Sequence, residues 1–219
     1  MSIEPGRVTR EHFSYIAART RRPDAFLLRL DEEARLAGLP AIRISDEEAS
    51  LMAILLKLVR ARRVIEVGTL AGFSAICMAR ALPRGGLVTT IENDPAHAAF
   101  AREHIAASDV AGKVEVIEGD AEEVLRGFEE STFDAAFVDA DKQRQVRFVE
   151  GCLRLLRPGG LLMVDNALAF GEILEAEPTD PDVPAVREFN DWLARDPRLE
   201  AVIVPVGDGL WVGLRTENG

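Results

Sequence analysis

The chain has 219 residues, of which 47% are hydrophobic and 29% charged. This length and composition predict one globular domain over residues 1–219. The formal charge of −11 repels phosphate backbones, which argues against a nucleic-acid partner. No apolar run approaches the ~20 residues that a membrane helix needs. The first 13 residues lack the apolar core of a signal peptide, and two cysteines cannot build a disulfide framework, so we expect a cytoplasmic protein.

The first sixty residues have the pattern of helices. Pro23 opens one predicted helix, and Gly38 closes it. Ser45 and Glu48 form an S-x-x-E capping box, which predicts the start of another helix. Apolar residues then recur at helical spacing as far as Val59, namely Leu51, Ile54, Leu55 and Leu58.

From residue 63 onward, short apolar runs alternate with helical stretches. Strands are predicted at 64–67, 87–92, 113–119, 133–140 and 161–165, the last after a turn at Pro158-Gly159-Gly160. Helices are predicted between them at 72–82, 96–107, 120–128 and 142–156. A helix near 183–194 follows, and then two strands, 200–206 and 210–215, which the sequence Gly207-Asp208-Gly209 joins as a hairpin.

This alternation predicts an α/β fold of seven strands. The sheet is expected to be mostly parallel and covered by helices on both faces, with one antiparallel strand at or near an edge. Ligands of such sheets bind outside the carboxyl ends of the strands. The functional residues are therefore expected just after the first five strands.

An acidic, glycine-containing loop follows the first strand. Glu66, Gly68 and Gly72 form the pattern E-x-G-x-x-x-G, which differs from the G-x-G-x-x-G of dinucleotide-binding folds. An acid in this place repels phosphate but can hold an ammonium group; the alternative is a plain strand–helix turn. Glu92 ends the second strand, where an acid commonly accepts from ribose hydroxyls. Asp120, after the third strand, either meets an adenine edge or caps the next helix, and the two roles do not conflict.

Two carboxylate clusters end the fourth and fifth strands. Asp139, Asp141 and Lys142 follow one apolar run, and Asp165 and Asn166 follow the other. An acid at the end of a buried strand is costly unless a partner satisfies it. If these strands are neighbours, Asp139, Asp165 and Asn166 share one cleft, and their oxygens suit Mg²⁺, Ca²⁺ or Mn²⁺. The alternative is that these acids cap helices.

Taken in order, these segments resemble the cation-dependent class I O-methyltransferases that use S-adenosylmethionine, the group of catechol and caffeoyl-CoA O-methyltransferases. The resemblance covers about residues 40–215. The segments that carry it are ISDEEASLMAILLKL, VIEVGTLAGFSAICMARAL, TTIENDP, FDAAFVDADK, LRPGGLLMVDN and FNDWLARDPRLEAVIVPVGDGLWV. It implies a Rossmann-like three-layer sandwich, with an N-terminal helical extension over 1–43 and a catalytic core over 44–219. It also implies a homodimer, for which the N-terminal helices offer an apolar surface.

The same resemblance implies a role for each cofactor-binding residue. Glu66 and the loop at Gly68 and Thr69 would hold the methionine part of S-adenosylmethionine, with Ser74 on its carboxylate. Glu92 would bind the ribose hydroxyls. The remaining contacts of the cofactor would be the backbone of Ile44, the amide of Ala121 at the adenine, and Asp139.

The resemblance further implies that Asp139, Asp165 and Asn166 hold the metal ion and that Lys142 is the general base. A small aromatic diol would be the acceptor, since a cation bound to both hydroxyls lowers their pKa of ~10 and fixes the angle of attack. The chain departs from the family at Gln145 and Phe148, where tyrosines are frequent, and at residues 167–171, where many relatives carry a tryptophan.

Three alternatives remain open at this point. A relative that methylates hydroxyuridine in tRNA would use the same cofactor and metal, although the charge of −11 speaks against it. A non-catalytic binding module or an NAD-dependent oxidoreductase could have the same fold. The E-x-G-x-x-x-G loop and the paired acids argue against both.

Overall fold

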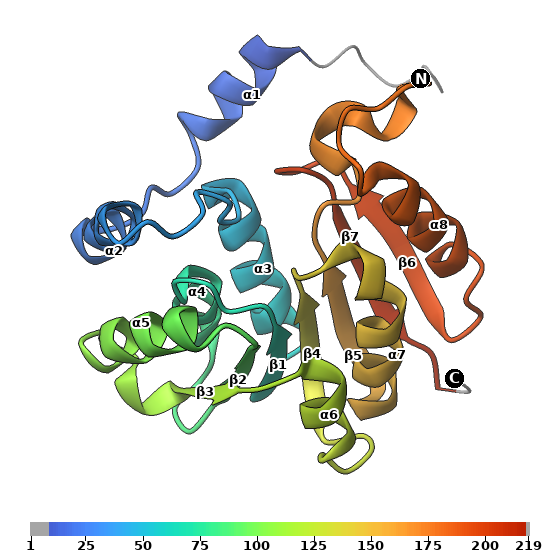
Figure 1. Cartoon of the computed structure of the whole chain (residues 1–219). Helices are drawn as coiled ribbons and strands as arrows, with labels where there is room; N and C mark the ends of the chain where they lie inside the picture. Colours follow the sequence, from blue (N-terminus) through green and yellow to red (C-terminus); the bar gives the residue numbers. More distant parts are fainter. Residues whose placement is uncertain (1–8, 218–219) are drawn as a thin grey trace.

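The structure, a computed structural model, describes residues 9–217 and contains one seven-stranded sheet (Figure 1). The strand order is β3-β2-β1-β4-β5-β7-β6. The five parallel strands are β1 (Arg63–Val67), β2 (Leu87–Glu92), β3 (Val114–Glu118), β4 (Phe133–Val138) and β5 (Leu156–Val164). β7 (Leu210–Arg215) runs antiparallel to β5 and to the edge strand β6 (Leu199–Val204). The predicted α/β fold, with its antiparallel strand next to an edge, is confirmed.

Helices cover both faces of this sheet. Successive side chains of a strand point to opposite faces of the sheet, which divides the core in two. Val64 and Phe137 pack on one face, and their neighbours Ile65 and Val138 pack on the other. The first face carries α3 (Asp46–Leu58), α4 (Phe73–Ala81) and α5 (Pro95–Ala106). The second carries α6 (Ala121–Arg126), α7 (Gln145–Leu155) and α8 (Val183–Leu193). Together these layers form the expected three-layer sandwich.

Two further helices precede the sheet. α1 (Arg10–Ala17) buries none of its residues, whereas α2 (Ala25–Leu36) packs through Leu27 and Leu30. The division into an extension over 1–43 and a core over 44–219 stays a prediction, and its residues 1–8 and 218–219 lie outside the described residues. Within residues 9–217, no helix combines the length and the apolar character needed to cross a membrane.

The helix boundaries follow local capping. α2 begins after Asp24, whose carboxylate accepts from the Leu27 amide at 3.0 Å, so Pro23 precedes the cap instead of opening the helix. The predicted capping box is confirmed, since the Glu48 amide donates to the Ser45 hydroxyl at 3.1 Å. The helix predicted over 142–156 is divided into the 3₁₀ turn η2 (Lys142–Arg144) and α7, because Asp141 caps η2 separately.

β5 differs from its prediction at the start. It begins at Leu156, which pairs with Phe133, and the register then shifts so that Leu161 pairs with Ala135. The Pro158-Gly159-Gly160 segment, predicted as a turn before the strand, is therefore an irregularity inside it. Sequence periodicity does not reveal this pairing, because the extra residues interrupt the alternation of β5.

Gly68 lies where the ends of the strands β1, β2 and β4 meet. Its amide donates to the Ile91 carbonyl of β2 at 3.0 Å, and the Asp139 amide after β4 donates to the Val67 carbonyl of β1 at 2.9 Å. Gly68 has φ +99°, and a Cβ atom there would lie 1.9 Å from the backbone oxygen of Asp139. Only glycine allows this approach. The strand ends that carry the predicted site are thus held together by backbone contacts.

Candidate active site

A cavity of about 860 Å³ opens at the carboxyl ends of the parallel strands. Most residues predicted for the site line it, namely Ile44, Gly68, Thr69, Ser74, Glu92, Ala121, Asp139, Lys142 and Asn166. Glu66 and Asp165 are not part of its lining and are 0% and 4% exposed. The structure therefore brings the predicted residues to one place, with two of the acids buried below its surface.

Glu66 is a carboxylic acid with incomplete hydrogen bonding. Its Oε1 accepts from the hydroxyl of Ser74 at 2.5 Å, while its buried Oε2 has no hydrogen-bond partner among residues 9–217. Burial raises the pKa of Glu66 to about 8, although hydrogen bonds from Ser74 and Thr90 oppose the rise. A cationic group that approached Oε2 would supply the favourable partner that this oxygen lacks. Ser74, which lines the cavity, connects Glu66 to it.

Glu92 holds the loop after β1. Its Oε2 accepts from the amides of Thr69 and Leu70 at 3.1 and 2.8 Å, and its Oε1 accepts from the amide of Asp94 at 3.0 Å. Three backbone donors compensate the burial of this carboxylate. The Glu92 side chain thus shapes the cavity wall in addition to the ribose contact predicted for it, which stays a prediction.

The ends of β4 and β5 bring the predicted metal ligands together. Val138 pairs with Val164 in the sheet, and the Asp165 amide donates to the Val138 carbonyl at 3.1 Å, so Asp139 and Asp165 follow adjacent strand ends. The Asp165 Oδ1 accepts from the Asn166 amide at 2.6 Å. Lys142 lies on the same edge, with its Nζ 3.2 Å from the Asp139 Oδ1.

A third acid, Glu48, lies against this pair and was not predicted to do so. Glu48 is 2% exposed, and its carboxyl group lies close to that of Asp165. Burial and then the charge of Asp165 raise the pKa of Glu48, and burial and then the charge of Asp139 raise that of Asp165.

The donor set at this edge fits a divalent cation only if Asn166 takes part. Within residues 9–217, no group of three or more His, Cys, Asp or Glu side chains is arranged to hold a metal ion. Glu48 therefore does not complete a ligand set with the two aspartates. Asn166, which lines the cavity beside Asp139, offers a further oxygen of the hard type that Mg²⁺ prefers.

Gln145 and Phe148 occupy the places where tyrosines were expected. Gln145 is 2% exposed, and its Nε2 donates to the Asp165 carbonyl at 3.3 Å. Phe148 lines the cavity and packs into the core. Gln145, which replaces a tyrosine frequent in the family, therefore packs under the end of β5 and does not line the cavity.

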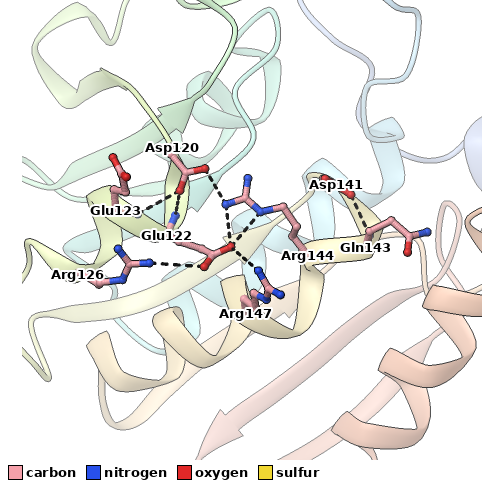
Figure 2. Close-up of polar contacts among 8 residues, drawn as sticks. All are labelled: Asp120, Glu122, Glu123, Arg126, Asp141, Gln143, Arg144 and Arg147. Atoms are coloured by element: carbon pink, nitrogen blue, oxygen red, sulfur yellow. Dashed lines mark hydrogen bonds and ion pairs between the residues drawn. The ribbon is translucent and has the colours of Figure 1, made fainter.

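Arg144, which lines the cavity, belongs to an ion-pair network that the sequence analysis missed (Figure 2). Asp120 caps α6 by accepting from the amides of Glu122 and Glu123 at 2.9 and 3.2 Å, which confirms the capping interpretation. Arg144 of η2 reaches both Asp120 and Glu122 at 2.7 Å. Hydrogen bonds from Arg144 hold the pKa of each carboxyl group below its usual range.

Arg144 therefore connects the two loops that flank the cavity at Ala121 and Lys142. Its guanidinium group also lies 5.0 Å from the centre of the Phe148 ring. Arg126 and Arg147 reach Glu122 as well, each at 3.6 Å, but they are 69% and 71% exposed in their side chains. A sequence signal for this contact was absent, because 24 residues of chain separate Asp120 from Arg144.

Comparisons with known proteins agree with this geometry. A family model described as O-methyltransferase matches residues 20–216. A catechol O-methyltransferase from Niastella koreensis is 36% identical, over 90% of this chain and 88% of the relative. A catechol O-methyltransferase from Mycobacterium tuberculosis is 38% identical, over 81% of this chain and 80% of the relative.

Solved structures give the same result. An O-methyltransferase from Bacillus cereus in complex with SAH is 31% identical, with a TM-score of 0.83 over 93% of this chain and 96% of that one. The O-methyltransferase TomG from Streptomyces achromogenes, involved in tomaymycin synthesis and in complex with SAM, is also 31% identical. Its TM-score is 0.82, over 93% of this chain and 95% of that one.

The pKa of Glu66 makes a prediction for stability. Between pH 4.5 and about 8, the folded chain keeps a proton on Glu66 that the unfolded chain has lost. Stability from this group therefore falls as the pH rises through that window, by up to about 1.4 kcal/mol for each pH unit. The side chain in Glu66→Gln cannot ionise, so this group adds no pH dependence. The free energy of unfolding of the variant minus that of the wild type, both measured with urea, should therefore increase as the pH rises from 5 to 8.

Glu130→Gln, a substitution at an exposed position, is the matched control, and its pH profile should run parallel to that of the wild type. A parallel profile for Glu66→Gln as well would contradict the burial of an uncompensated carboxyl group at the end of β1.

The Arg144 network makes a second prediction. Arg144→Ala should weaken the binding of S-adenosylhomocysteine several-fold, as measured by titration calorimetry. The reason is that the N-terminus of α6 loses its ion pairs with η2. Arg147→Ala removes a more exposed cation from the same carboxylate and should leave the affinity unchanged. Equal losses in the two variants would contradict a specific role of Arg144 and leave only an effect of net charge.

Proposed function

Since the chain belongs to the O-methyltransferase family and is an enzyme that uses S-adenosylmethionine, we propose that it methylates one hydroxyl of a small catechol-like acceptor with the help of a divalent cation. The observation that carries this proposal is the pair Asp139 and Asp165 at adjacent strand ends, with Asn166 next to them. Two carboxylates and an amide oxygen beside a methyl-donor site match the needs of a vicinal diol, which binds a cation through both oxygens.

The cavity of about 860 Å³ is proposed to hold the methyl donor and the acceptor together. S-adenosylmethionine supplies the methyl group from a cationic sulfonium, which suits an acidic cleft. Glu66, with its unpartnered Oε2, is proposed to compensate the ammonium of the methionine part. The other contacts of S-adenosylmethionine are proposed to be Ile44, Gly68, Thr69, Ser74, Glu92, Ala121 and Asp139.

A divalent cation at Asp139, Asp165 and Asn166 would supply positive charge that lowers the pKa of a hydroxyl next to it. Mg²⁺ is the proposed ion, and Mn²⁺ or Ca²⁺ would suit the same oxygens. The proton of that hydroxyl is proposed to pass to Lys142, whose Nζ lies 3.2 Å from the Asp139 Oδ1 at the same edge. The acceptor oxygen then forms its bond to the methyl carbon as the S–CH₃ bond breaks.

Apolar residues provide a surface for an aromatic ring. Ala169, Val183 and Val186 pack on one another and line the cavity, and Phe170, which is 65% exposed, lines it beside them. The relatives named catechol O-methyltransferase support a small acceptor of this kind. A tRNA acceptor is less favourable, because the net charge of −11 repels phosphates.

We also propose that the chain forms a homodimer through its N-terminal helices. α1 exposes Phe13, Tyr15 and Ile16 by 46–60% and buries no residue. An apolar helix face of this kind is unfavourable in water unless a partner covers it. A cytoplasmic location is proposed from the sequence alone.

An acceptor screen tests the proposed function. The purified chain, labelled S-adenosylmethionine and Mg²⁺ should methylate caffeate or 3,4-dihydroxybenzoate, whereas 4-hydroxybenzoate and undermodified tRNA should remain unlabelled. EDTA should abolish the transfer and Mg²⁺ should restore it, because the cation carries the activation of the hydroxyl. Asp139→Ala should abolish it as well, and the exposed substitution Asp191→Ala should not.

Transfer that persists both in EDTA and in Asp139→Ala would contradict the metal-dependent reaction. Label on tRNA alone would contradict the catechol-like acceptor and favour the hydroxyuridine reaction.

A further inference from the structure

The turn between β6 and β7 lies directly against the loop that follows β5. The Ala167 amide donates to the Gly209 carbonyl at 2.8 Å, and the Leu168 amide donates to the Asp208 carbonyl at 2.9 Å. Gly207, with φ +55°, is so close to Glu48 that a Cβ atom would lie 1.9 Å from the Glu48 Oε2. The sequence Gly207-Asp208-Gly209 thus does more than reverse the chain, because it packs against Glu48 and against the residues that follow Asn166.

Asp208 is the polar side chain of this turn. One of its oxygens, Oδ2, accepts from the Nδ2 of Asn166 at 3.2 Å and from the backbone amide of Phe170 at 2.8 Å. It therefore touches a proposed metal ligand and the exposed aromatic residue at the acceptor side of the cavity. The side chain is partly buried, so water competes only in part for these contacts.

The chemistry of this contact fixes the orientation of the Asn166 amide. An ionised carboxylate only accepts hydrogen bonds, so it requires the NH₂ group of Asn166 on its side. The amide oxygen must then point away from Asp208. Asn166 has φ +66° and lines the cavity, and its backbone amide is already bound to Asp165. Backbone and side chain are thus both held, and only the amide oxygen remains for a ligand.

We propose that Asp208 is a positioning residue that holds the amide oxygen of Asn166 toward a divalent cation. This inference rests on the proposed metal site and adds a residue from the β6–β7 turn that does not itself contact the ion. Without Asp208, the amide can rotate and present its NH₂ group, which repels a cation. The bond to Phe170 keeps the 3₁₀ segment η3 (Ala169–Leu174) in place beside the same ligand.

Titration of Mn²⁺ followed by its electron paramagnetic resonance signal measures this role without turnover. Asp208→Ala should lower the Mn²⁺ affinity about 10-fold, within the range of 10- to 100-fold that outer-shell partners of metal ligands contribute. Asp208→Asn keeps the shape and an acceptor oxygen, so its loss should be smaller. The affinity for S-adenosylhomocysteine without metal should equal that of the wild type in both variants, which shows that the cavity is intact.

A double-mutant cycle distinguishes positioning from a general loss of structure. If Asp208 acts through Asn166, the variant Asn166→Ala/Asp208→Ala should bind Mn²⁺ as weakly as Asn166→Ala alone. Additive losses would overturn the inference, because Asp208 would then act independently of the ligand. Asp191→Asn, at a position 74% exposed in its side chain, is the matched control and should bind Mn²⁺ as the wild type does.

Asp165→Ala separates this inference from the proposed function. Loss of Mn²⁺ binding in Asp165→Ala together with wild-type affinity in Asp208→Ala would overturn the role of Asp208 and leave the metal site standing. Wild-type affinity in Asp165→Ala would overturn the metal site, and the role of Asp208 with it.

Discussion

The burial of carboxyl groups at the carboxyl edge of the sheet is the constraint on which the site depends. Glu66 lies near the end of β1, and Asp139 and Asp165 directly follow β4 and β5. Glu66 and Asp165 are 0% and 4% exposed, and the burial of a carboxylate is strongly unfavourable unless donors, protons or cations compensate it. Backbone contacts of Val67 and Gly68 with Asp139 hold the ends of β1 and β4 close together.

The acids at this edge are compensated in different ways, and the difference separates structural from ligand-binding roles. Glu92 accepts from three backbone amides, and Glu48 accepts from the Ser45 amide beside Asp165. Among residues 9–217, Glu66 keeps an oxygen without a hydrogen-bond partner, and the ammonium of Lys142 lies beside Asp139. The carboxyl groups without full compensation are thus those for which we propose contacts with an ammonium and a metal ion. The same surroundings are unfavourable for a phosphate cofactor.

The sequence was most informative where local rules act. The alternation of strands and helices predicted the sheet, and its parallel order placed Asp139 and Asp165 together, because the ends of neighbouring parallel strands meet at one edge. The contacts that it did not reveal join segments far apart in the chain. Glu48 satisfied a capping box and gave no sign of its contact with Asp165. Arg144 and the β6–β7 turn have no periodicity or motif that indicates their partners, and the register shift in β5 depends on its pairing with β4.

The central claim, that Asp139 and Asp165 at the ends of β4 and β5 hold a cation, is tested most directly by anomalous scattering from crystals grown with Mn²⁺ and S-adenosylhomocysteine. We expect one strong manganese peak in contact with oxygens of Asp139, Asp165 and Asn166, and with the Asn166 amide nitrogen still on Asp208. Crystals that bind S-adenosylhomocysteine but have no manganese between these three side chains would contradict the claim.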